Sequence, residues 1–252
     1  MIALRRGLVV VGVVLALWWG LSEANMWTDY VLPPPGRVWR TAVTMVTTGE
    51  LVGHVLVSLG RVLVGFGAAF LVAFALGLLG SAFPRPIAYV TPALSFLRNV
   101  PPLSLIPLLI LWFGIGETAK ILVIALTAFF PMYMSTVKGL RACNPHLLDV
   151  GVVRGLSPTR SLVLIRLPHA VPDVLVGMRI SLGFAWRALV GAEMIAAASG
   201  LGYLVLDAQV MSRSDKVIVG ILAIGLAGMT ADRVFAQVTR RTRRWGIDDS
   251  WS

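Results

Sequence analysis

The sequence of 252 residues has one cysteine, three histidines and few charged residues, and each scarcity excludes a class of protein. A lone Cys143 cannot form an intrachain disulfide, and the histidines lie too far apart in sequence to suggest a metal site. No glycine is followed by lysine, so the chain has no G-x4-G-K-[ST] phosphate loop. Nor does it show the histidine pair, nucleophile-elbow serine or paired aspartates of an intramembrane enzyme, so we expect a protein that is not an enzyme.

Apolar residues are abundant instead. The chain is 57% hydrophobic and 13% charged, with a mean hydropathy of +0.84, which is typical of integral membrane proteins. The net charge of +10 does not indicate nucleic-acid binding, because the basic residues fall mostly in short segments between apolar runs. We therefore expect an all-α integral membrane protein with one domain that covers residues 1–252.

Six segments are apolar and long enough to cross a hydrocarbon core, which takes about 20 helical residues. They are Gly7–Leu21, Val55–Phe83, Ile87–Phe113, Ile121–Val137, Val171–Ala198 and Val217–Val238. The first is short, and a signal peptide is the alternative. We favour a retained anchor, because no clear small-x-small cleavage site follows and Trp18 and Trp19 suit a membrane interface. In the second span, Gly65, Gly67, Gly77 and Gly80 allow close helix approach.

The basic residues predict the orientation of these spans. With both termini inside, twelve Lys or Arg are cytoplasmic and five lie outside or at that boundary, which agrees with the positive-inside rule. The cytoplasmic set is Arg5, Arg6, Arg85, Lys138, Arg141, Arg154, Arg160, Arg166, Arg240, Arg241, Arg243 and Arg244. The outer set is Arg37, Arg40, Lys120, Arg213 and Lys216. On the outer side, a short helix after Pro33–Gly36 is expected at the interface, with Val38, Ala42 and Val46 on its apolar face.

The cytoplasmic loop at about residues 138–169 carries strong helix signals. Asn144 before Pro145 predicts a helix start, and Gly155 is suited to end that helix in the left-handed conformation. Ser157 and Pro158 predict a second short helix that stops before Pro168. The two helices would form an elbow below the membrane. Two interpretations stay open: the elbow docks on a protein partner, or it rests on lipid headgroups.

The elbow resembles the E-A-A-x3-G-x9-I-x-L-P signature of binding-protein-dependent ABC importer permeases. The spacing fits without a gap, although Asp149, Val150 and Gly151 replace Glu-Ala-Ala. LPPPGRVW, SLGRVLVGF, FLRNVPPLSLIPLLILWFGIGE and GMRISLGFAWRALVGAEMIAAASGLGYLV further resemble the nitrate, taurine and aliphatic sulfonate group, over most of residues 30–240. The resemblance assigns ATPase coupling to Asp149, Val150, Gly151, Arg154, Gly155, Leu156, Ile165, Leu167 and Pro168.

The resemblance implies a type I ABC importer permease fold with a cytoplasmic coupling helix in a bacterial inner membrane. It implies a homodimer of this chain, two cytoplasmic ATPase subunits that bind ATP and Mg, and an external solute-binding protein. The solute would be a small anion such as a sulfonate, taurine or nitrate. A second permease of different sequence is possible in place of the second copy. The alternative function is a proton-coupled secondary transporter, which six spans and intramembrane charges alone would allow.

Charged residues inside the predicted spans indicate pairing or a wet pathway. Arg61 and Glu193 fall at similar outer depth, so we predict that they pair. Arg187 falls near mid-depth, where it either contacts an anionic solute or is satisfied by backbone carbonyls. Arg98 and Asn99, before Pro101 and Pro102, mark a broken helix whose freed carbonyls can line a cavity.

Overall fold

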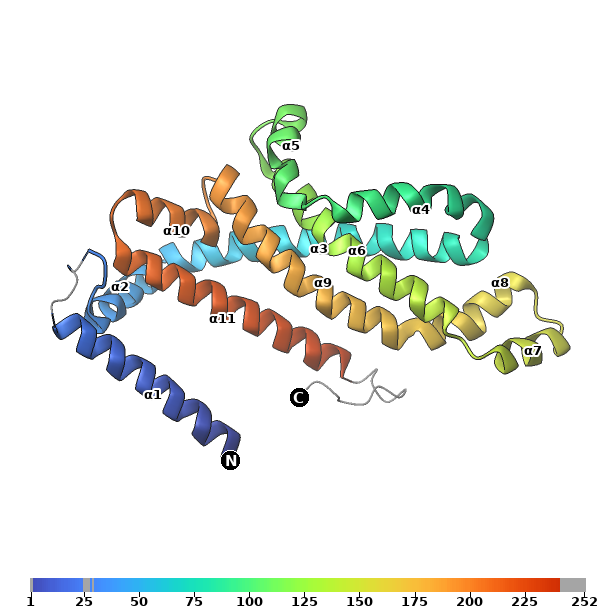
Figure 1. The fold of residues 1–252 in the computed structure, drawn as a ribbon, viewed down its shortest axis with the longest axis horizontal. Coiled ribbons are helices and arrows are strands. Elements are labelled where there is room, and N and C mark those ends of the chain that lie inside the picture. Colours follow the sequence, from blue (N-terminus) through green and yellow to red (C-terminus); the bar gives the residue numbers. More distant parts are fainter. Residues whose placement is uncertain (1, 25–27, 29, 241–252) are drawn as a thin grey trace. The chain divides into compact units, whose positions relative to one another are not determined.

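A computed structural model describes residues 2–24, 28 and 30–240, and the part of the chain that it describes consists of helices joined by short turns and loops, with no strand (Figure 1). The C-terminal arginines Arg241, Arg243 and Arg244, which entered the predicted orientation, lie outside the described residues. The first half of the chain contains α1 (Ile2–Glu23), α2 (Pro35–Thr47), α3 (Glu50–Ala82), α4 (Pro84–Asn99), the 3-10 turn η1 (Pro102–Leu105), α5 (Ile106–Phe113) and α6 (Glu117–Arg141). The second half contains α7 (Pro145–Val153), α8 (Pro158–Ser161), the π-helical turn η2 (Leu162–Arg166), α9 (Leu167–Ala196), α10 (Leu201–Val210) and α11 (Ser214–Thr239).

Among the described residues, four helices are long and apolar enough to cross a membrane. They are α3, α6, the continuous run Pro158–Ala196 that includes α9, and α11. A fifth span is formed if the bent pair Arg85–Asn99 and Pro102–Phe113 counts as one, and this pair bends by 91°. The bend confirms the predicted break of the third span, where Pro101 and Pro102 remove two backbone donors. The first predicted span falls on α1. The described apolar part of this helix, Gly12–Glu23, is among the apolar helices of 10–17 residues, which are shorter than the four spans above.

Residue contacts group the chain into two compact units, and α3, α9 and α11 contribute residues to both. One unit comprises Met1–Ser58 and Glu193–Ala227, and the other comprises Leu59–Ala192 and Gly228–Ser252. The expectation of one membrane domain over residues 1–252 stays a prediction.

The core of the unit that holds residues 59–192 depends on small side chains. Ala69, Ala73, Ala128 and Ala185 are buried beside larger residues such as Met132. Two of the four glycines predicted to allow close approach do so here. A Cβ on Gly65 would lie 2.7 Å from Ile124, and one on Gly77 would lie 2.6 Å from Thr136. Gly80 leaves ordinary contact space and Gly67 faces open space, so the pattern overstated the number of tight contacts.

In the unit that holds residues 1–58, the short helix predicted near Pro33–Gly36 forms as α2. Val38 and Met45 are buried, whereas Val46 is 52% exposed. Thr41, on the Val38 and Met45 side, donates a 2.6 Å hydrogen bond to the buried carboxylate of Asp215. Arg213 donates two further bonds to that carboxylate, at 2.9 and 2.8 Å, and this contact raises the pKa of Arg213. The buried face of α2 therefore combines apolar packing with a polar contact, which hydrophobic periodicity alone could not show.

Candidate functional site

The elbow forms as its capping residues predict. The Asn144 side chain accepts a 2.9 Å hydrogen bond from the His146 backbone at the start of α7. Gly155, which follows α7, has a φ of 68°, a conformation that strongly favours glycine. The Ser157 side chain accepts a bond from the Arg160 backbone and caps α8. Figure 1 shows α7 and α8 together beyond the end of α6 and the start of α9.

One prediction about the elbow is wrong. The second short helix does not stop before Pro168 but continues through η2 into α9, as one helical run from Pro158 to Ala196. A proline inside a regular α-helix removes one hydrogen bond and crowds the carbonyl four residues earlier. The π-helical turn Leu162–Arg166 widens the backbone just before Pro168 and so accommodates the ring. The elbow is therefore attached to α9 without an interrupting loop.

The elbow has a packed inner side and an exposed outer side. Gly151 is buried, and a Cβ on it would lie 2.8 Å from Cδ1 of Ile165. Leu156 also lies near Gly151, and both Leu156 and Ile165 are half-buried. On the outer side, the exposed residues are Leu147, Asp149, Val150, Val152, Val153 and Arg154. This surface combines apolar side chains with a carboxylate and a guanidinium, which is the composition of a docking surface.

Next to the elbow, three contacts join the end of α6 to the start of α9. Lys138 forms a 2.9 Å ion pair with Asp173, and the Ala142 carbonyl lies 3.2 Å from Nε2 of His169. Between these contacts, Gly139 leaves room for α9, since a Cβ on it would lie 3.0 Å from the Ala170 carbonyl oxygen. A force applied to the elbow would therefore reach both α6 and α9 directly.

Glu117 binds two buried cations at the start of α6. Its carboxylate accepts hydrogen bonds from Nε of Arg61 at 2.6 Å, from Nη2 of Arg61 at 2.7 Å and from Nζ of Lys120 at 2.7 Å. Arg61 and Lys120 are each only about 5% exposed. Residue types alone did not identify this cluster, although an acidic residue three positions before a lysine, at the start of a span, could have suggested it.

Glu193 is fully buried and helps to bind the start of α10. Its carboxylate accepts bonds from the Ser58 hydroxyl at 2.8 and 2.9 Å and from the Gly202 backbone at 2.9 Å. Ser58 Oγ in turn accepts a 2.8 Å bond from the Leu201 backbone, and Nδ1 of His54 accepts a 3.0 Å bond from the Gly200 backbone. Three consecutive backbone donors are thus satisfied by side chains. Because Arg61 and Glu193 belong to different units, their direct pairing stays a prediction.

Arg187 lies on α9 and is exposed. Its Nε donates a 3.1 Å hydrogen bond to the Gly183 carbonyl, and its guanidinium lies 5.0 Å from the centroid of the Phe184 ring. These two contacts orient the side chain and leave the terminal guanidinium nitrogens available. Within the described ranges, Arg187 forms no ion pair with a carboxylate.

The break between α4 and η1 also presents polar side chains. Arg98 and Asn99 are both exposed at the end of α4, and the Asn99 amide donates a 2.8 Å bond to the Ser95 carbonyl.

Arg179 of α9 and Asp232 of α11 form two parallel 2.9 Å hydrogen bonds. That pair was not predicted, although opposite charges in two predicted spans are a usable signal.

Comparison with known proteins places these features in a family. Residues 85–244 match the family model described as "Binding-protein-dependent transport system inner membrane component". An aliphatic sulfonates transport permease protein of Bacillus subtilis is 36% identical over 240 residues, which cover 95% of this chain and 87% of that protein. The taurine transport system permease protein of Escherichia coli is 33% identical over 92% of this chain and 86% of its own length.

A solved structure supports the fold. The inward-facing MetNI methionine ABC transporter matches with a TM-score of 0.60 at 19% sequence identity. The match covers 75% of this chain and 96% of the matched chain. At this identity the likeness concerns the fold alone.

Proposed function

The chain belongs to the family of binding-protein-dependent transport system inner membrane components, the permeases of ABC importers, and we propose that its solute is a small anion. It is a multi-pass membrane protein and a transporter subunit. Family membership sets aside the alternative of a proton-coupled secondary transporter. The rest of the importer is part of the proposal: a second copy of this chain, two cytoplasmic ATPase subunits with ATP and Mg, and an external solute-binding protein.

The elbow is the proposed docking surface for the ATPase, which puts it and both termini in the cytoplasm. Its capped helices and the close contact of Gly151 with Ile165 favour a rigid element, which a docking role requires. The exposed carboxylate of Asp149 and the apolar side chains of Val150 and Val153 would face the ATPase. The alternative, an elbow that rests on lipid headgroups, would not need this rigid inner packing.

Co-purification from the native membrane tests the docking role. Asp149→Lys and Gly155→Trp should each lose the ATPase subunit, whereas the wild type retains it. Two variants serve as matched controls. Glu23→Lys reverses another exposed acid, and Gly155→Asn introduces a residue that tolerates positive φ. Retention of the ATPase by Asp149→Lys and Gly155→Trp would contradict docking at the elbow.

Arg187 carries the proposal of an anionic solute. Sulfonates and related anions accept hydrogen bonds from a guanidinium in a fixed geometry, and Arg187 is oriented by Gly183 and Phe184 with donors to spare. The two named relatives are permeases for aliphatic sulfonates and for taurine, and both solute types carry a sulfonate group. Arg98, on the broken third span, is the second candidate contact with the solute.

Uptake of labelled taurine and of an alkanesulfonate by intact cells tests the role of Arg187. Arg187→Gln should abolish uptake, and Arg187→Lys should reduce it because an ammonium cannot reproduce the guanidinium fork. Basal ATPase activity and subunit composition of the purified complex should stay unchanged in both variants. Normal uptake by Arg187→Gln would show that the arginine is structural, satisfied by its backbone carbonyl contact.

A further inference from the structure

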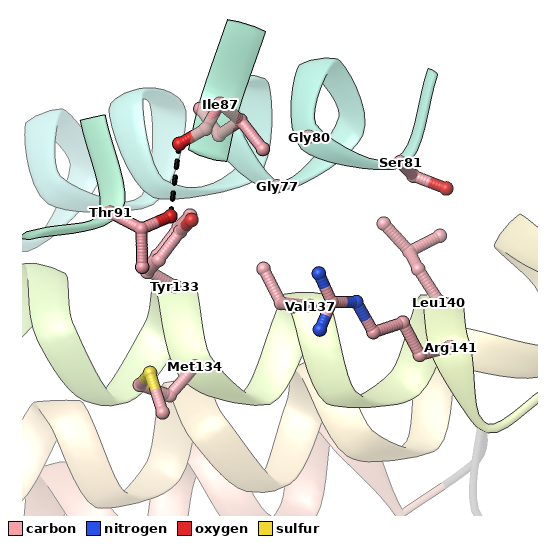
Figure 2. Close-up of a pocket in the computed structure, with 10 residues that line it drawn as sticks. All are labelled: Gly77, Gly80, Ser81, Ile87, Thr91, Tyr133, Met134, Val137, Leu140 and Arg141. Carbon is pink, nitrogen blue, oxygen red and sulfur yellow. Dashed lines mark hydrogen bonds between the residues drawn. The ribbon is translucent and has the colours of Figure 1, made fainter. Parts of the chain in front are cut away.

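A small cavity lies among the ends of α3, α4 and α6. Its volume is about 190 Å³, and Figure 2 shows its lining, which includes Gly77, Gly80, Ile87, Thr91, Tyr133 and Arg141. The two glycines belong to the wall that α3 contributes, where they bring α3 close to Thr136 of α6 and to Ile87 of α4. Pockets for drug-sized ligands usually measure about 300–1,000 Å³. The cavity is smaller, so it can hold a small group or one segment of a longer chain, and its lining decides between them.

The lining has apolar walls and one cation. The Thr91 hydroxyl donates a 2.9 Å hydrogen bond to the Ile87 carbonyl, so its donor is satisfied without a ligand. Figure 2 shows the Arg141 side chain folded back along α6, with its guanidinium beside Val137. Arg141 is exposed, and no carboxylate of the described residues pairs with it. An occupant must therefore present an apolar stem with an anionic end.

The cavity lies where the chain leaves the apolar part of its spans. α3 ends at Ala82, α4 begins at Pro84 and α6 ends at Arg141, so the cavity is bordered by three helix ends. At this level a membrane protein meets lipid headgroups, and basic pockets between helices bind anionic lipids by their phosphates. A bilayer supplies a molecule with an apolar stem and an anionic end at this depth.

We propose that this cavity binds an anionic phospholipid, with one acyl chain against Ile87, Tyr133 and Val137 and the phosphate on Arg141. The proposal requires only that the chain spans a membrane and does not depend on the identity of the solute. With the predicted orientation, the lipid belongs to the cytoplasmic leaflet. Lys138 lies close in sequence but is already paired with Asp173, so Arg141 carries the recognition of the phosphate.

Photolabelling of the intact complex in nanodiscs tests the proposal. The probe is a phosphatidylglycerol that carries a diazirine in one acyl chain, and mass spectrometry locates the labelled peptides. We expect labels in residues 85–98 and 131–141. Loss of one cation near a membrane surface should reduce labelling of Arg141→Gln about fivefold. Arg85→Gln removes a neighbouring cation that does not line the cavity and should leave labelling unchanged.

A second pair of variants tests the cavity itself. Thr91→Phe fills the space and should abolish labelling, whereas Thr91→Val keeps the size of the side chain and should not.

Equal labelling by a phosphatidylcholine probe, with no effect of Arg141→Gln, would overturn headgroup recognition. Competition by inorganic phosphate or taurine would indicate a site for a free anion and overturn the lipid. Cross-links between two copies of the chain at these residues would show that a protein surface fills the cavity. Thermal unfolding of each variant verifies that it folds. If Thr91→Phe fails to fold, the labelling of Arg141→Gln decides the outcome.

Discussion

Gly151 and Ile165 lie so close together that a methyl group on Gly151 would sit 2.8 Å from Cδ1 of Ile165. Gly151 belongs to α7 and Ile165 to the π-helical turn that leads into α9. The contact therefore determines how closely the exposed helix of the elbow approaches the helix that enters the membrane.

Gly151→Ala should weaken coupling between solute binding and ATP hydrolysis. The added methyl group overpacks the contact and forces Cδ1 of Ile165 to move, and the cost of about 1–3 kcal/mol typical of overpacking is an upper figure because this atom ends a flexible side chain. The measurement is stimulation of ATPase activity by the loaded binding protein, with the complex reconstituted in liposomes. Ile165→Val removes Cδ1, so the double variant Gly151→Ala/Ile165→Val should recover stimulation. A double variant no better than Gly151→Ala would show that this contact is not the cause.

The sequence predicted the parts of the elbow that depend on local interactions. Asn144, Gly155 and Ser157 act within a few residues of their own position, so their capping roles could be inferred without a structure. Passage of the helix through Pro168 could not, because the widened turn before it has no sequence signature. The polar contact of α2 could not be inferred from the sequence either, because it depends on Thr41 reaching Asp215, 174 positions away.

The same distinction between local and long-range interactions applies to the charged residues in the spans. Their presence in the spans was visible in the sequence, whereas the partners of Glu117 and Asp232 depend on how helices pack. Ser58 had no signal at all, since one hydroxyl in an apolar run is usually a packing residue. Its role requires the backbone donor of Leu201 and the carboxylate of Glu193 to lie beside it.

Ser58→Ala should destabilise the complex without changing its subunit composition. The hydroxyl donates to Glu193 and accepts from the Leu201 backbone, and both of these groups are buried. Leaving such groups unsatisfied costs about 1–3 kcal/mol. Thermal unfolding of the purified complex should show a lower midpoint for Ser58→Ala. Thr44→Ala, which removes an exposed hydroxyl bonded only within α2, is the control and should leave the midpoint unchanged.

Asp232→Asn should reduce the yield of correctly folded protein. It leaves Arg179 charged in a membrane span, at a cost of about 2.5–3.5 kcal/mol at mid-depth. Arg179→Gln/Asp232→Asn removes both charges and should restore part of the yield, measured as the monodisperse fraction after size-exclusion chromatography. If the monodisperse fraction of the double variant is lower than that of Asp232→Asn, the two side chains contribute to folding by more than charge neutralisation.

Glu117→Gln should lower the thermal unfolding midpoint by more than the half-exposed position of Glu117 suggests. Glu117 is 56% exposed, but its partner Lys120 is about 5% exposed and, among the described residues, has no other carboxylate partner. Removing one member of a buried ion pair costs about 3–5 kcal/mol, because the remaining charge is left without compensation, and the exposure of Glu117 makes this an upper figure.

The rescue of Glu117→Gln follows from the same argument. Lys120→Met retains the apolar volume of the lysine stem and removes its charge, so Glu117→Gln/Lys120→Met should unfold at a higher temperature than Glu117→Gln alone. Lys120→Met by itself should be mild, because Glu117 keeps its two bonds to Arg61 and is reached by solvent. The unfolding midpoints of the three variants, measured in the same detergent, decide the question. A midpoint of Glu117→Gln that Lys120→Met cannot raise would mean that the damage arises through Arg61, and that Lys120 is stably buried without its carboxylate.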